Sequence, residues 1–386
     1  MLNDQIPLSK SISIRNAFLA QNHEQLASIV ESCDDVLEAK SVMSRFLSDQ
    51  KLFNVNASAT VFRFLCVYLM SKKGKFCIQM GSQLGRRNHD FIRQIAEIFQ
   101  AEYIWRNNEC IIEGGGYSLS QLSVDWTPEI TSQPLSALLL WSARNNVVLE
   151  LSNSEQQHLS YSYFMLTVNL IMKYGIQIVS KEKNLILDPI KFNVSKYYTE
   201  FDVSSYVSSC LYRLTFEDVI IDDHYILGSI QAEARIWGQI LMALVVERVG
   251  YGYLNVKKIE GCKFELEFNL SQAIDIFPVL VATICLSSQS ITKISGIEAL
   301  VHKESNRLLE TLKLIEPFKE YYFKSGVLFI EDKKVNLKSS YWKRDHVEDH
   351  RMVMAAMCVE KICSQKFSNL SKKALSKSFS NFGEVR

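Results

Sequence analysis

The most informative segment of this chain reads His302-Lys303-Glu304-Ser305-Asn306-Arg307 and directly follows the apolar stretch Ile294–Val301. Its glutamate and arginine are three residues apart, so they can pair on one face of a helix, which is typical of a helix start on the surface. Two other basic segments favour a further interpretation, because Pro7–Arg15 opens the chain and Asp349-His350-Arg351 lies near its end. Three cationic clusters so far apart predict one anion-binding site assembled from the whole chain.

Composition limits the kinds of partner. A chain of 386 residues with 47% hydrophobic residues can bury a large core, and its length favours two domains. The 43 basic and 42 acidic side chains nearly cancel, so there is no broad positive field to attract nucleic acid or an anionic membrane. The longest apolar run, Ile276–Leu286, is too short to cross a bilayer. We therefore expect no nucleic acid and no membrane as partners.

Cysteine usage points to a reducing compartment. The chain has nine cysteines, an odd number, with no CxxC pair and several inside apolar runs. This pattern predicts reduced core residues rather than a disulfide framework. The first residues, Met1–Gln5, lack the basic and apolar regions of a secretory signal. We expect a cytoplasmic protein that acts as a monomer.

The secondary-structure pattern is mixed. Strand-like runs such as Phe76–Met80 and Gly326–Ile330 alternate with helix-like runs such as Asp90–Ala101 and Ala232–Arg248. A helix followed by a short strand pair recurs loosely, although the copies share too few residues to establish a repeat. The sequence predicts an α/β fold and contains no linker that would mark a domain boundary.

The three basic segments resemble the enolpyruvyl transferases, and among them the 5-enolpyruvylshikimate-3-phosphate (EPSP) synthases. The signature segments of that family are close to PGSKSxSNR, LxxKESDR and DHRxAM, in that order. Here they read PLSKSISIR, LVHKESNR and DHRMVM, beginning at Pro7, Leu300 and Asp349. Their shared order and wide spread make coincidence improbable, so the resemblance covers essentially the full chain.

This resemblance implies both a fold and a reaction. It implies two similar domains, residues 9–200 and residues 1–8 plus 201–386, each built of three βαβαββ units with buried helices and outward-facing sheets. The active site would lie in the interdomain cleft. The implied enzyme transfers the enolpyruvyl group of phosphoenolpyruvate to the 5-hydroxyl of shikimate-3-phosphate and releases phosphate, on the shikimate pathway to chorismate and aromatic amino acids. It needs no cofactor.

Such a reaction places clear demands on side chains. Two phosphates and two carboxylates must be held by several cations, and an acid and a base must move protons. Matching the family motifs position by position implies a set of shikimate-3-phosphate ligands, some of them hydroxyls before a helix, where free amides can bind phosphate. This set comprises Lys10, Ser11, Arg15, Thr131, Ser132, Gln133, Ser160, Tyr163, Asp275 and Lys303.

The same matching assigns phosphoenolpyruvate and the proton transfers. The implied phosphoenolpyruvate ligands are Lys10, Gln133, Arg307, Arg351 and Lys377. The implied catalytic residues are Lys10, Asp275 and Glu304. We assign Asp275 as the base that takes the proton of the sugar hydroxyl, because an aspartate beside an apolar run is costly to bury unless it is hydrogen bonded. We assign Glu304 to deliver and remove the methylene proton, because a carboxyl among cations can be tuned by its neighbours.

Some segments depart from the family pattern. Asn56–Leu65 keeps the expected Thr60 and Arg63 but has lost both glycines of the family segment. Asn88 stands where the family has an arginine that binds phosphoenolpyruvate, and Arg87 could replace that arginine after a shift of one residue.

A further segment lies where the resemblance places the second domain crossing. Glu200–Ser205 resembles the family's EGDxSSA, in which the aspartate lies at the crossing between domains. A lone aspartate shortly before a serine, as at Asp202, is more often a helix N-cap, so the resemblance implies only a weaker role here.

Three alternatives remain open. His346 and His350 with neighbouring carboxylates could suggest a metal site, but they coincide with the DHR segment, and we expect no metal. A UDP-N-acetylglucosamine enolpyruvyl transferase would lack the SKSxSxR opening and use a loop cysteine as its acid. A non-catalytic relative could bind a phosphorylated ligand, although the chain retains Asp275, Glu304 and the basic ligands together.

Overall fold

The computed structural model describes most of the chain. The described residues are 6–87, 89–118, 120–125, 132–152, 161–181, 184–188, 192, 194–222, 224–259, 265–333, 349–364, 367, 370 and 372–384.

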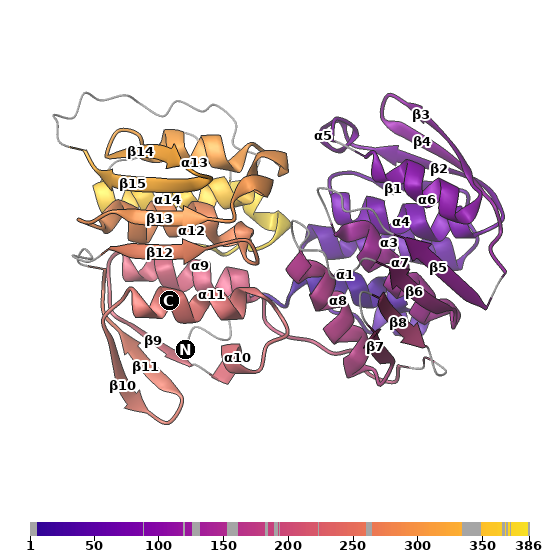
Figure 1. Cartoon of the computed structure of the whole chain (residues 1–386), viewed down its shortest axis with the longest axis horizontal. Coiled ribbons are helices and arrows are strands. Elements are labelled where there is room, and N and C mark those ends of the chain that lie inside the picture. The colour runs from indigo at the N-terminus through magenta and orange to yellow at the C-terminus, as the bar shows by residue number, and fades with distance from the viewer. Residues whose placement is uncertain are drawn as a thin grey trace. The chain divides into compact units, whose positions relative to one another are not determined.

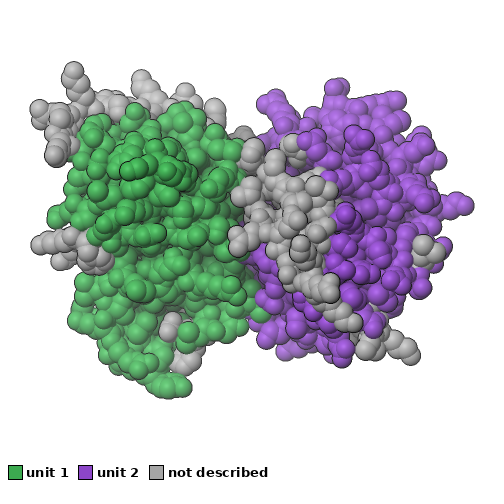
Figure 2. All heavy atoms as spheres, in the orientation of Figure 1, with its two compact units in different colours: residues 1–7, 201–386 green, residues 8–200 purple. Residues whose placement is uncertain are grey.

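The chain forms two compact units, coloured separately in Figure 2. The N-terminal unit is Leu8–Glu200, and the C-terminal unit combines Met1–Pro7 with Phe201–Arg386. Two backbone hydrogen bonds accompany the crossings: Ser9 N–H donates to the Glu200 carbonyl at 2.8 Å, and Asp202 N–H donates to the Pro7 carbonyl at 2.9 Å. The first division thus falls after Pro7, where we expected it after Leu8.

The N-terminal unit contains two four-stranded sheets of the same topology (Figure 1). The first has the order β1-β2-β4-β3 and the second the order β5-β6-β8-β7. In each sheet the first two strands are parallel and the other pairs are antiparallel. The strands are β1 (Leu52–Val55), β2 (Gly74–Met80), β3 (Glu102–Arg106), β4 (Glu109–Gly114), β5 (Gln121–Asp125), β6 (Val148–Ser152), β7 (Gln177–Lys181) and β8 (Asn184–Asp188).

Helices connect these strands in βαβαββ order and supply the core. They are α4 (Ala59–Ser71), α5 (Ser82–Gly85), α6 (Phe91–Phe99), α7 (Gln133–Asn145) and α8 (Tyr161–Lys173). Helices α4 and α7 are buried over most of their length, whereas strands such as β1 and β5 alternate exposed and buried residues. Each sheet therefore covers the helices with one face and turns the other to solvent.

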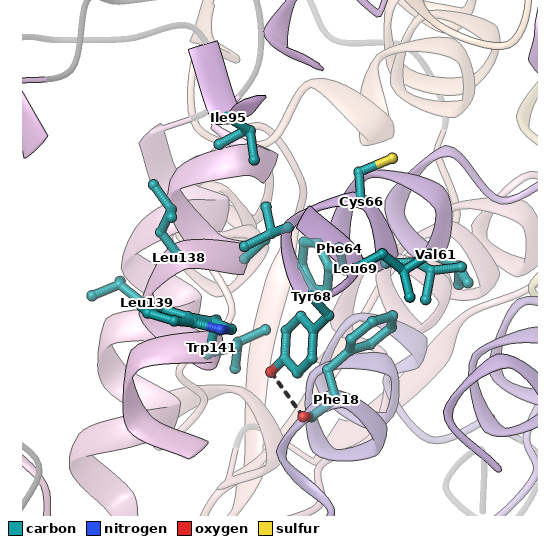
Figure 3. Close-up of a cluster of buried hydrophobic side chains, with 14 of the residues drawn as sticks. Phe18, Val61, Phe64, Cys66, Tyr68, Leu69, Ile95, Leu138, Leu139 and Trp141 are labelled. Atoms are coloured by element: carbon teal, nitrogen blue, oxygen red, sulfur yellow. Dashed lines mark hydrogen bonds between the residues drawn. The ribbon is translucent and has the colours of Figure 1, made fainter. Parts of the chain in front are cut away.

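Figure 3 shows how this core is packed. The Phe18 ring makes edge-to-face contacts with Phe64 and Tyr68, at centroid distances of 5.3 and 5.2 Å. The Tyr68 hydroxyl donates to the Phe18 carbonyl at 2.8 Å, so the one polar atom of this ring is satisfied inside the core. These contacts join α4 to the first helix of the unit.

The start of the N-terminal unit is helical. It contains α1 (Lys10–Leu19), α2 (His23–Ala27) and α3 (Asp34–Leu47), and none of the described residues before β1 forms a strand of a sheet. Helix α3 buries Val36, Ala39, Val42 and Met43. These positions recur at intervals of three or four residues, as on one face of a helix, and do not alternate as the buried residues of a strand would. This explains why the described residues of this unit hold two βαβαββ units where we expected three.

The C-terminal unit has one four-stranded sheet of the same topology and one smaller sheet. The complete sheet has the order β12-β13-β15-β14, and the smaller one is antiparallel with the order β10-β11-β9. The strands are β9 (Val219–Asp222), β10 (Val246–Gly250), β11 (Tyr253–Val256), β12 (Leu266–Asn269), β13 (Thr292–Ser295), β14 (Lys319–Lys324) and β15 (Val327–Asp332). Within the described ranges this unit therefore holds one complete repeat and one partial repeat, again fewer than expected.

Buried helices again form the interior of this unit. They are α9 (Val203–Leu214), α10 (His224–Leu227), α11 (Glu233–Met242), α12 (Phe277–Leu280), α13 (Arg307–Ile315) and α14 (His350–Cys363), with short helical turns η2 (Ile274–Ile276), η3 (Val281–Cys285), η4 (Glu298–His302) and η5 (Lys372–Lys377). Helices α9, α12 and α14 pack together behind the sheets. The predicted α/β fold of two units with buried helices is confirmed.

Among the described helices, none is both long enough and apolar enough to span a membrane.

Candidate active site

Lys10 begins helix α1 and lies in an ion pair. Its ammonium nitrogen is 3.2 Å from a carboxylate oxygen of Asp35, and the two side chains are 20% and 10% exposed. Asp35 stands in the first turn of α3. Sequence analysis missed this partner, since an acidic residue in a first helical turn is ordinarily explained by the helix dipole alone.

Arg15 lies inside the N-terminal unit rather than at its surface. It is 2% exposed, and its Nε donates to Thr167 Oγ1 at 2.7 Å. Its two terminal nitrogens donate to the carbonyls of Ser11 and Tyr163, at 2.8 and 2.9 Å. The guanidinium group therefore joins α1 to α8 and fixes the backbone that carries Tyr163. Direct binding of shikimate-3-phosphate by Arg15 stays a prediction.

A second group joins the N-terminal ends of α4 and α7. Arg63 Nη1 donates to Gln133 Oε1 at 2.7 Å, and Gln133 Nε2 donates to Thr60 Oγ1 at 2.9 Å. These two bonds use the accepting and the donating end of one amide, and they orient its side chain. Ser132, which is 1% exposed, precedes Gln133 at the N-cap position. The structure thus brings two residues of the altered Asn56–Leu65 segment to the predicted Gln133.

His89 links this group to Arg87. Burial lowers the pKa of His89 to about 4; the hydrogen bond to the Leu84 carbonyl opposes this, and the charges of Arg63 and Arg87 add to it. The neutral imidazole packs against Phe62 with a centroid distance of 4.7 Å. Both guanidinium charges thus act on the same imidazole. Binding of phosphoenolpyruvate by Arg87 stays a prediction.

The C-terminal unit contains the other candidates together with two residues of the DHR segment, and we call the whole set the C-terminal charge cluster: Asp275, Lys303, Glu304, Arg307, Asp349, His350, Arg351 and Lys377. Helix ends position them. Asn306 caps α13 by accepting from Leu309 N–H at 3.0 Å, so that the helix begins at Arg307, within the run that predicted a helix start. Asp349 caps α14 by accepting from Arg351 N–H at 3.0 Å.

Arg307 is the centre of this cluster. Its Nε and Nη2 donate to the two oxygens of Asp349 at 2.8 and 3.2 Å, a bidentate pair. Its Nη1 donates to Asp275 Oδ1 at 2.7 Å, and Lys303 Nζ lies 3.1 Å from the same oxygen. Ser305 Oγ donates to Asp349 Oδ2 at 2.9 Å. The carboxylates of Asp275 and Asp349 therefore pair with the two cations Lys303 and Arg307.

Glu304 contacts two other members of the cluster, Lys377 and His350. Its Oε1 lies 2.9 Å from Lys377 Nζ and its Oε2 lies 3.5 Å from His350 Nδ1. The structure thus brings together the predicted Glu304 and Lys377, which are far apart in sequence. Sequence analysis gave no role to Asp349 or His350, although both belong to the DHR segment.

Opposing effects determine the pKa values of the cluster. Burial disfavours the ionised form of Asp275, but the charges of Lys303, Arg307 and Arg351 outweigh it and hold the pKa of this carboxyl well below its ordinary value. For Glu304, burial is likewise outweighed by His350, Lys377 and Arg307, and the pKa is well below ordinary. Both groups are carboxylates at neutral pH, so in this state both can accept protons and neither can donate one.

Arg351 differs from Arg307 in its partners. It is 3% exposed, and its hydrogen-bond acceptors within the described chain are neutral: Ser204 Oγ, Ser208 Oγ at 3.5 Å and Met354 Sδ at 3.8 Å. Its buried Nε has no acceptor among the described residues. A buried guanidinium without a carboxylate partner is costly unless an anion binds it. Arg351 is therefore a strong candidate to bind an anionic ligand.

The cluster also contains a grouping that could hold a metal ion. Glu304, Asp349 and His350 each offer one ligand atom, and these atoms lie within 4.8 Å of one another. The two carboxylates of this grouping face Lys377 and Arg307, however, so two positive charges already occupy the positions next to them. The geometry is that of a network of ion pairs.

Comparison with known families gives the assignment. A sequence model of EPSP synthase (3-phosphoshikimate 1-carboxyvinyltransferase) matches residues 19–385. The chain belongs to this family. It is accordingly a carboxyvinyltransferase, and the family resemblance stated from the motifs is confirmed. Compared directly with curated protein sequences, the chain has no match.

Solved structures from the EPSP synthase family have a similar fold. One structure of EPSP synthase from Acinetobacter baumannii has 16% sequence identity and a TM-score of 0.68, covering 99% of this chain and 94% of that chain. Another structure of EPSP synthase from Acinetobacter baumannii has 16% identity and a TM-score of 0.62, covering 97% and 95%. The fold is therefore retained where most residues have changed.

Several predicted residues of this EPSP synthase family member lie outside the described residues. They are Thr131 and Ser160, predicted to bind shikimate-3-phosphate, together with Asn88 and His346. The other candidates form two sets, one in each unit. The N-terminal unit holds Lys10, Ser11, Arg15, Arg87, Ser132, Gln133 and Tyr163, and the C-terminal unit holds the charge cluster.

Proposed function

We propose that this chain transfers the enolpyruvyl group of phosphoenolpyruvate to the 5-hydroxyl of shikimate-3-phosphate and releases phosphate. Beside the family assignment, the observation that carries the proposal is Arg351, a buried guanidinium whose hydrogen-bond acceptors among the described residues are neutral and whose charge helps to lower the pKa of Asp275. Phosphoenolpyruvate supplies a carboxylate and a phosphate for such a cation, and the planar fork of arginine matches both groups.

Each set of residues has its own part in the proposal. In the N-terminal unit, Lys10, Ser11, Ser132, Gln133 and Tyr163 bind shikimate-3-phosphate, and Arg15 supports them. Thr131 and Ser160 would extend this set. In the C-terminal unit, the ligands are Lys303 for shikimate-3-phosphate and Arg307, Arg351 and Lys377 for phosphoenolpyruvate. Lys10 and Gln133 would contact phosphoenolpyruvate as well, and Arg87 would take the place of the missing arginine.

In this proposal, the substrates prepare Asp275 and Glu304 for proton transfer by competing with them for the nearby cations. In the addition step, the 5-oxygen of the sugar bonds to carbon 2 of phosphoenolpyruvate while the methylene carbon gains a proton; in the elimination step, that carbon loses a proton and phosphate leaves. Anionic substrates compete for Lys303, Arg307 and Lys377, which are the charges that lower the pKa of Asp275 and Glu304. Bound substrates would therefore raise both pKa values and strengthen Asp275 as the base and Glu304 as the proton carrier.

The setting of the enzyme is part of the proposal. The eight cysteines among the described residues are all free thiols, which supports a reducing compartment such as the cytoplasm. We also propose that the protein is a monomer. Static light scattering at the concentration used in the assay can test this directly.

Phosphate release tests the function. We expect release from phosphoenolpyruvate only when shikimate-3-phosphate is present, and a loss of at least about a hundredfold in kcat for Glu304→Gln, the size expected for an acid–base group. Glu310→Gln is the matched control, because Glu310 is a buried glutamate of α13 to which no role is assigned. An inert wild type, or equal losses in both variants, would reject the proposal.

A further inference from the structure

The hydroxyl of Ser204 lies between two buried groups of opposite charge. Arg351 Nη2 donates to Ser204 Oγ, and Ser204 Oγ donates to Asp202 Oδ1 at 2.7 Å. All three residues are nearly excluded from solvent, with exposed fractions of 3%, 5% and 7% for Arg351, Ser204 and Asp202. The three side chains form a chain of hydrogen bonds inside the C-terminal unit.

The chemistry of the three groups allows only this direction of donation. A guanidinium can only donate and an ionised carboxylate can only accept, whereas a hydroxyl has one proton and two lone pairs. Ser204 therefore gives its proton to Asp202 and a lone pair to Arg351. A direct carboxylate contact, such as Arg307 has with Asp349, would neutralise the guanidinium and compete with an anionic ligand. The serine orients Arg351 and leaves its charge available.

Asp202 is itself held firmly. It caps α9, because its Oδ1 also accepts from Ser205 N–H at 2.7 Å. Its own N–H donates to the Pro7 carbonyl at 2.9 Å. Ser208, one turn further along α9, donates to the Ser204 carbonyl at 2.7 Å and lies 3.5 Å from Arg351 Nη1. The start of α9 thus contacts Arg351 through a connected set of hydrogen bonds.

We propose that Ser204, oriented by Asp202, is a positioning residue that holds the Arg351 guanidinium ready for the anionic groups of phosphoenolpyruvate. This inference rests on the proposed function and adds to it a residue whose role is exerted through Arg351. Its loss should therefore weaken the binding of phosphoenolpyruvate, while the binding of shikimate-3-phosphate and the stability of the fold stay close to those of the wild type.

The neighbouring residue provides a matched control. Ser205 is 0% exposed on the same helix, and its Oγ has no hydrogen-bond partner among the described residues. Ser204→Ala and Ser205→Ala each remove one hydroxyl oxygen from the same turn, and both serines are buried. Only the first removes an acceptor from Arg351. Ser204→Thr keeps the hydroxyl and serves as the conservative rescue.

Steady-state kinetics of the full chain test the inference, with both substrates varied. For Ser204→Ala we expect the KM for phosphoenolpyruvate to rise about tenfold, the order of one hydrogen bond to a charged group. The KM for shikimate-3-phosphate should stay within about twofold, and Ser204→Thr should recover most of the change. Ser205→Ala should match the wild type, and all variants should melt within a few degrees of it.

The outcomes separate the inference from the proposed function. An active wild type with equal effects of Ser204→Ala and Ser205→Ala, or with equal rises in both KM values, would overturn the positioning role alone. A wild type without turnover would overturn the proposed function and the inference with it.

Discussion

Replacing Asp349 by asparagine should destabilise the C-terminal unit by a predictable amount. The Asp349 and Arg307 side chains are 2% and 4% exposed, and their bidentate contact spans 2.8 and 3.2 Å. Removing one partner of a buried ion pair costs about 3–5 kcal/mol. Asparagine keeps an oxygen to cap α14, and Asp275 still faces Arg307, so we expect the lower end, about 3 kcal/mol.

Calorimetry of the full chain measures this effect. For a unit of this size, about 3 kcal/mol corresponds to a fall in Tm of about 6–12 °C. Asp218→Asn is the control, since Asp218 also accepts from a backbone N–H and lies near a lysine, but its side chain is 47% exposed. That variant should melt within about 2 °C of the wild type. Equal Tm values for the two variants would refute the argument from burial.

Three further predictions follow from the same contacts. The buried carboxyls of the C-terminal charge cluster, those of Asp275, Glu304 and Asp349, have pKa values below their ordinary values. The stability that they contribute is therefore present above their unfolded pKa of about 4 and is lost as the pH falls through the folded values. The Tm of the wild type should fall steeply below about pH 4, and a flat profile there would contradict the ion-pair account. Arg87→Ala should raise the KM for phosphoenolpyruvate about tenfold, whereas Arg86→Ala, next to it and exposed, should not; equal values would remove Arg87 from the site. Arg15→Lys loses the fork that joins α1 to α8, so we expect a several-fold rise in the KM for shikimate-3-phosphate, and an unchanged value would show that the tie does not position the ligands.

Local rules predicted much of this structure. Asn306 caps α13 and Asp202 caps α9, as short polar residues before apolar runs indicate. The alternation of strand-like and helix-like runs predicted the α/β class. The number of repeats came from the family instead. The described residues contain fewer complete repeats than we expected, and before β1 the spacing of Val36, Ala39 and Val42 is that of a helix.

Long-range pairing limited the prediction of the site. The motifs named Lys10, Glu304 and Arg307, but a local pattern carries no information on partners such as Asp35, which is 25 residues from Lys10. Asp349 was visible in the DHR segment, but it is 42 residues from Arg307, and the motif carries no information on that partner. The pKa of His89 is lowered because its ring is buried against aromatic side chains, and only the folded chain brings these side chains together.

The central claim is enolpyruvyl transfer to shikimate-3-phosphate, and ³¹P NMR of one reaction mixture tests it most directly. With both substrates present, the account predicts that the phosphoenolpyruvate signal disappears, inorganic phosphate appears in equal amount, and the shikimate-3-phosphate signal moves to that of its enolpyruvyl ether. Phosphate release at the same rate without shikimate-3-phosphate, or no change in any of the signals, would contradict it.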